Sequence, residues 1–178
     1  MAINIQRMEL WRLIALEFGV PGGDRMVQDD SIPMRKMIVR GPVAMAVDGT
    51  GVIWKPFERY SCVLQFRPKG LDDPGEVRGD TAIHYEWVVR SSERMLDVAL
   101  HFQYPDVGTN QDWLDRVPKP PPFLFEGREI ESEPERFKRW TGWRYRLRYA
   151  GNGPSDDMAG PAARAMEQLI FHTISRIV

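Results

Sequence analysis

Hydrophobic and polar residues alternate most regularly in the middle of the chain, in two neighbouring stretches, 81–90 and 95–104. Such alternation is typical of strands, because successive side chains point to opposite faces of a sheet. The short polar segment between the stretches predicts a hairpin with a turn centred on Ser92 and Glu93. The apolar positions that would share one face are Ile83, Tyr85, Trp87 and Val89 in the first stretch, and Leu96, Val98, Leu100 and Phe102 in the second.

Apolar residues follow a helical spacing near both ends of the chain. At the N-terminal end the spacing predicts a helix through residues 8–18, in which Leu10, Leu13 and Leu16 lie off the main apolar face. Such a helix is either covered on two sides or partly buried in a subunit contact, so self-association is expected. The pattern at 161–178 predicts a second helix.

The segments between these elements predict the rest of the fold. Shorter strands are expected at 36–40, 43–47, 52–57, 60–67, 123–133 and 143–149, with a turn at Asp48–Gly51, and a long loop is expected at 105–122. The prediction is therefore a single α+β domain over residues 1–178, an antiparallel meander sheet flanked by an N-terminal and a C-terminal helix.

Composition narrows the class of protein. The chain has 178 residues, and a hydrophobic fraction of 43% is too high for an intrinsically disordered chain. The 24 basic and 25 acidic residues leave a net charge of −1, which by itself favours neither nucleic acid nor a membrane as partner. Cys62 is the single cysteine, and no apolar run is long enough to span a bilayer. A cytoplasmic protein without a membrane partner is expected.

Two histidines would meet if the central hairpin has the expected turn. That register puts His84 directly opposite His101, with Glu86 and Asp97 farther along the same face. Opposed residues have Cβ atoms about 5 Å apart, so the histidines could ligate one metal ion, with Glu86 as third ligand or base. Glu86 and Asp97 are then candidate catalytic residues. We expect instead a polar face turned to solvent, with no cofactor, and keep the metal site as the alternative.

The segment 136–149, RFKRWTGWRYRLRY, contains six basic and five aromatic residues and no acid. Cations contact phosphates and aromatic rings stack on bases, so the pattern indicates a nucleic-acid interface. Its candidate binding residues are Trp143 and the arginine row, which we define as Arg144, Arg146 and Arg148.

An opposing row of acids precedes this segment. Three glutamates alternate at 129, 131 and 133, and an antiparallel pairing would set each against one arginine. We expect this ion-pair ladder rather than a nucleic-acid partner, because the two rows explain each other. The expected pairs are Glu133 with Arg144, Glu131 with Arg146, and Glu129 with Arg148.

Asp106, Glu135 and Lys138 partly match the order of acidic and basic residues found in metal-dependent nucleases. Asp106, which follows a proline, precedes Glu135 and Lys138 in the chain. In the nuclease layout the last two stand two residues apart, whereas here they stand three apart, so the pattern assigns no site.

The stretches QRMELWRLIALEFG, MLDVALHFQ, EIESEPERFKRWTGWRYRLRY and AMEQLIFHTISRI, in this order, cover much of the chain. Together they resemble a bacterial domain of unknown function that accompanies nucleases and restriction systems. The resemblance implies an accessory or binding role near nucleic-acid-processing proteins, and it assigns no catalytic residues.

Two functional hypotheses follow. The first is a non-enzymatic, macromolecule-binding domain of a cytoplasmic bacterial protein, working as a homo-oligomer or with a protein partner. It depends on the absence of sequence motifs for nucleotide binding or nucleophilic catalysis. The alternative is a metal-assisted hydrolase of phosphoesters that uses His84, Glu86, Asp97 and His101.

Overall fold

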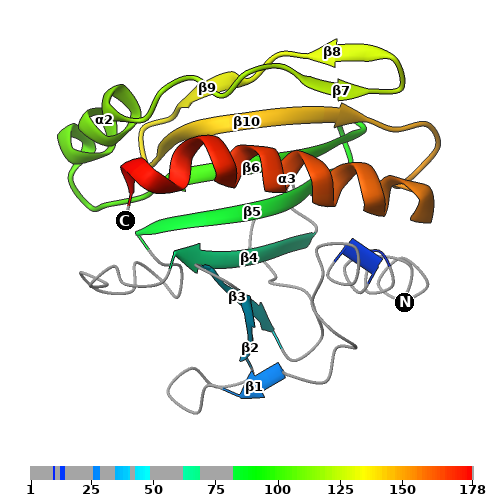
Figure 1. Ribbon diagram of the computed structural model, residues 1–178, viewed down its shortest axis with the longest axis horizontal. Helices are drawn as coiled ribbons and strands as arrows, with labels where there is room; N and C mark the ends of the chain where they lie inside the picture. The colour runs from blue at the N-terminus through cyan, green and yellow to red at the C-terminus, as the bar shows by residue number, and fades with distance from the viewer. Residues whose placement is uncertain are drawn as a thin grey trace.

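One antiparallel sheet organises the structure (Figure 1). The computed structural model describes residues 82–177, the residues Leu10, Leu13 and Ile14, and the backbone of residues 26–28, 35–40, 43–48 and 62–68. Within this part of the chain, eight strands lie in the order β1-β2-β3-β4-β5-β6-β10-β9. They are β1 (Met26–Gln28), β2 (Arg35–Arg40), β3 (Val43–Asp48), β4 (Cys62–Pro68), β5 (Ile83–Arg90), β6 (Met95–Phe102), β9 (Glu133–Arg136) and β10 (Thr141–Arg148).

Helices and a small hairpin accompany this sheet. Helix α3 (Ala159–Thr173) crosses one face of it, between the short 3-10 turns η2 (Asp156–Met158) and η3 (Ile174–Arg176) (Figure 1). Helix α2 (Val107–Arg116) contacts β6 and β10. Strands β7 (Phe123–Phe125) and β8 (Arg128–Ile130) pair only with each other among the described strands, in a separate two-stranded sheet. The fold is α+β, as the sequence predicts.

The apolar ladders of the central hairpin face α3 and form the core. All eight predicted apolar positions of β5 and β6 are buried. Two polar atoms in this layer are matched by the helix: the Tyr85 hydroxyl lies 2.8 Å from Oγ1 of Thr173, and the Trp87 indole N–H donates to the Ala162 carbonyl at 2.9 Å. These bonds fix α3 over the hairpin, because a buried donor or acceptor left unpaired costs about 1–3 kcal/mol.

The register of the central hairpin is confirmed. Residues 91–94 form the turn, and His84 pairs with His101. A bulge or a slip of one residue would have moved the histidines to opposite faces of the sheet.

Helix α2 was not predicted, since the long loop expected at 105–122 contains it. Its apolar periodicity is weak: only Asn110 and Leu114 are buried. The chain nevertheless carries a helix start signal, because the Asp106 side chain accepts a hydrogen bond from the Thr109 amide at 2.8 Å.

Other predictions differ from the structure or concern residues outside its described part. The expected strand 123–133 is two strands, β7 and β8, separated by a turn at Glu126 and Gly127, both with positive φ. The expected strand 52–57, the turn after Asp48 and most of the N-terminal helix lie outside the described residues. Leu10 and Ile14 are buried in the core, and Leu13 packs partly against it. Among the helices that the structure describes, none has the length and apolar character needed to span a bilayer.

Candidate functional site

The second face of the central strands is polar, and it is buried. Residues of β5, β6, β10 and β9 that alternate with the core positions lie side by side on this face. The expectation of a solvent-facing surface is therefore wrong: His84, Glu86, Asp97, His101 and Glu135 are each 3% exposed or less. Buried ionisable groups persist only when they are paired or bind a metal, so this face carries a dense set of contacts.

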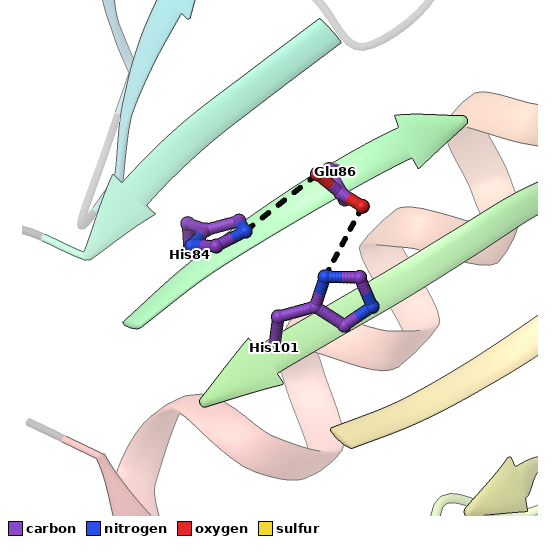
Figure 2. A group of neighbouring side chains, drawn as sticks. All are labelled: His84, Glu86 and His101. Carbon is purple, nitrogen blue, oxygen red and sulfur yellow. Dashed lines mark ion pairs between the residues drawn. The ribbon is translucent and has the colours of Figure 1, made fainter. Parts of the chain in front are cut away.

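His84, Glu86 and His101 converge, as the register predicts; we call them the histidine cluster (Figure 2). His84 and Glu86 share a face because they stand two apart on β5, and His101 projects beside them from β6. Nδ1 of His101 lies 3.1 Å from one Glu86 carboxylate oxygen, and Nε2 of His84 lies 3.6 Å from the other. One donor atom from each of the three residues lies within 4.8 Å of the other two.

Glu135 supports the cluster from two strands away. Its carboxylate forms a hydrogen bond with Nε2 of His101, reaching across β10, the strand between them. Gly142 of β10 is paired with both residues, and a Cβ there would lie 3.0 Å from Cδ2 of His101. The glycine therefore leaves the space through which His101 and Glu135 meet.

The two carboxylates decide the charge of His101. Burial by itself lowers the pKa of His101, but Glu86 and Glu135 outweigh it and raise that pKa to about 9. Burial by itself raises the pKa of Glu135, because it disfavours the charged carboxylate. His101, Arg144 and Arg90 outweigh burial and hold this pKa below its usual value. At neutral pH His101 is therefore a cation between two carboxylates, and a proton on Nδ1 faces Glu86.

Three arginines neutralise the rest of the polar face. Asp97 is paired with Arg90, with Arg144 at 3.1 Å and with Arg146 at 3.2 Å. Glu135 is also paired with Arg144 at 3.0 Å and with Arg90 at 3.4 Å. Asp97 therefore belongs to this arginine–carboxylate network and not to the histidine cluster.

The predicted ion-pair ladder is confirmed at one position and wrong at two. Glu133 is opposite Arg144, with 3.4 Å between the charged groups. The ladder ends there because β8, which carries Glu129, pairs with β7. Glu131 forms its ion pair with Lys119 at 2.8 Å.

Two members of the arginine row, Arg144 and Arg146, are paired by acids outside the predicted ladder. Arg146 binds Asp97 and Glu93, and the contact with Arg146 lowers the pKa of Glu93. Arg148 is exposed, and no described carboxylate lies within ion-pair distance of it. Trp143 is on the opposite face and donates its indole N–H to the Val117 carbonyl at 3.1 Å. The four candidate binding residues therefore do not share a surface.

The first part of the same basic and aromatic segment does reach the surface. A tight turn joins β9 to β10, closed by a hydrogen bond of 2.9 Å from the Phe137 amide to the Trp140 carbonyl. Arg136, Phe137, Lys138 and Arg139 are all exposed. The Phe137 and Trp140 ring centroids are 4.8 Å apart, and Trp140 in turn lies 5.9 Å from the His101 ring. We call residues 136–140 the basic turn.

A scan against protein-family models and searches of curated proteins and of solved structures each found no match.

The sequence did not indicate two important members of the site. Glu135 drew attention only through the nuclease-like spacing to Lys138, and Arg90 had no signal beyond its place at the end of a strand. The pairing of Glu133 with Arg144, extended by two residues along β9, puts Glu135 opposite Gly142 on the polar face. The glycine opposite Glu135 in this pairing is the signal that could have identified Glu135 as a member of the site.

Proposed function

We propose that the protein is a metal-binding, non-enzymatic accessory domain, in which the histidine cluster binds one divalent ion of the zinc class. The convergence of His84, Glu86 and His101 carries the proposal. Tetrahedral zinc with nitrogen and oxygen ligands at about 2.0–2.2 Å has ligand atoms roughly 3.3–3.6 Å apart. The observed separations of 3.1 and 3.6 Å, each from a different oxygen of Glu86, lie near that range, and one donor atom from each residue lies within 4.8 Å of the others, so side-chain movements that draw the three together would complete the site.

The surroundings of His101 support a metal ligand at Nδ1. Its other nitrogen is bound by Glu135, and metal-bound histidines typically give their second N–H to a carboxylate. That contact fixes the ring and leaves Nδ1 directed at Glu86. A cation on Nδ1 would replace the proton that the two carboxylates stabilise there, so metal binding would release a proton.

The donor set indicates the class of ion. Imidazole nitrogen favours zinc, copper, nickel or iron over magnesium and calcium, which prefer sites made only of oxygen. Burial of all three ligands suits an ion that stabilises the fold, because a substrate would need a path to the site.

Metal content tests this proposal. The full chain, purified without chelator, should contain about one equivalent of zinc, or should bind Co²⁺ with the intense visible absorption of a tetrahedral site. The variant with both His84→Gln and His101→Gln should lose both signals. His172→Gln, at the partly exposed third histidine, on α3, is the matched control and should keep them. Wild-type protein that binds neither ion would overturn the proposal.

Metal-assisted hydrolysis of phosphoesters is a second candidate. One observation favours it: the cluster supplies three protein ligands, and zinc sites with three ligands leave a fourth position for water. Turnover of a chromogenic phosphodiester by the zinc-loaded protein, lost in the double histidine variant, would favour catalysis. Zinc binding without turnover would favour the accessory role.

The proposal includes a bacterial cytoplasmic location and self-association through the N-terminal segment. Leu13 supports self-association because it is only partly packed against the core. Sedimentation of the wild type and of Leu13→Glu at micromolar concentration tests it. An oligomer that dissociates on substitution is the expected result, and a monomer in both cases would exclude self-association.

A further inference from the structure

We propose that the basic turn, residues 136–140, binds single-stranded nucleic acid. This inference does not depend on metal at the histidine cluster, and it names a partner for the accessory role. It starts from a difference within the segment 136–149. Arg144 and Arg146 form ion pairs with carboxylates, whereas the cations of the turn just before them are exposed to solvent.

The charges of the turn are available for phosphates. Lys138 and Arg139 are exposed, and neither forms an ion pair with any described residue. Arg136 donates a hydrogen bond to the Gln111 side chain of α2 and has Asp115 at 4.0 Å, but the Arg136 and Asp115 side chains are more than half exposed, so solvent screens this pair. Three cations within four residues therefore form a local positive patch on a chain whose net charge is −1.

An aromatic ring lies among these cations. Phe137 is 44% exposed although it is a large apolar side chain, and its inner side rests on Trp140. Trp140 in turn rests against His101, so the platform is built on the buried polar face. A supported aromatic ring flanked in the chain by cations provides a surface on which a base can stack while nearby cations bind phosphates.

The geometry favours a single strand over a duplex. Base faces are covered in a duplex, and a turn of this size offers a ring beside its tip, not a helix or ribbon that could read a groove. An acidic peptide could satisfy the cations, but it would gain nothing from the flat aromatic surface. DNA and RNA strands share the chemistry that the turn recognises.

The test is fluorescence anisotropy with the full-length protein and labelled 12-nucleotide strands of dT and rU, a duplex and an acidic peptide as probes. Wild type should bind single strands, and raising the salt concentration tenfold should weaken binding roughly 25- to 130-fold, as two to three phosphate contacts require. Phe137→Ala should weaken it roughly 5- to 150-fold. The double variant Lys138→Ala, Arg139→Ala should abolish most of the binding.

A matched double variant, Arg128→Ala with Arg176→Ala, removes the same charge from exposed sites outside the basic and aromatic segment and should bind like wild type. Equal loss in both double variants would show that only net charge matters and would overturn the proposal. Tighter binding of the peptide or of the duplex, or no binding of single strands by wild type, would also overturn it. Repeating the titration with chelator separates this result from the metal proposal: binding that survives metal removal supports the turn whether or not the histidine cluster holds zinc.

Discussion

Glu135 should be far more important for stability than Glu133, its neighbour two residues earlier on the same strand. Both carboxylates contact Arg144, at 3.0 Å for Glu135 and 3.4 Å for Glu133. They differ in solvent access: the Glu135 side chain is 0% exposed and the Glu133 side chain 51%. Substitution by glutamine keeps the shape of each side chain and removes its charge, so the pair isolates the effect of burial.

The expected magnitudes follow from this difference. Glu135→Gln leaves Arg90, Arg144 and protonated His101 with one buried carboxylate fewer, and removing one partner of a buried ion pair costs about 3–5 kcal/mol. The change Glu133→Gln removes a solvent-screened pair, which is worth about 0–1 kcal/mol.

Urea denaturation at pH 7 with chelator present measures both free energies of unfolding without a metal contribution. Glu135→Gln should lose at least about 2 kcal/mol more than Glu133→Gln. Losses within about 1 kcal/mol of each other would refute the view that the polar face is a tightly coupled, buried network.

Three further predictions concern the core and the polar face. Gly142→Ala puts a Cβ 2.0 Å from a backbone carbonyl oxygen of β6, so it should cost about 3 kcal/mol or more, whereas Gly153→Ala, with nothing within 4 Å, should be nearly neutral by thermal unfolding. Tyr85→Phe removes the buried hydroxyl bonded to Thr173 and should cost about 1 kcal/mol by the same measurement. Without metal, the stability provided by charged His101 is complete below its unfolded pKa of about 6.5 and is lost as pH rises through its folded pKa of about 9. The urea midpoint should therefore fall further between pH 6 and pH 9.5 for wild type than for His101→Gln.

The part of the site that lies on one hairpin could be predicted from the sequence. Strict alternation on both sides of a short turn leaves few registers, and a slip of one residue would turn one apolar ladder away from the core. The meeting of His84 with His101 followed from this constraint. The burial of the same face did not, because the alternation of β5 and β6 is the one expected of a sheet with a solvated side.

The part that depends on distant segments could not be predicted. Glu135 reaches His101 across β10, and this contact requires the order β6-β10-β9, which no local pattern specifies. Two of the three predicted ladder pairs are absent for a related reason. The turn at Glu126 and Gly127 lets β8 pair with β7, so Glu129 does not lie opposite the arginine row.

The arginine–carboxylate network also distinguishes the observed alignment of β6 and β10 from shifted ones. A shift of two residues keeps every apolar side chain on the core face, so the core alone would tolerate such a misaligned sheet. The polar face would not: in one direction Arg144 would replace Gly142 opposite His101, setting two cations together and filling the space through which Glu135 reaches the ring. Misaligned pairings would leave buried charges unmatched, and the buried ions thereby select one alignment among several that the hydrophobic residues would accept.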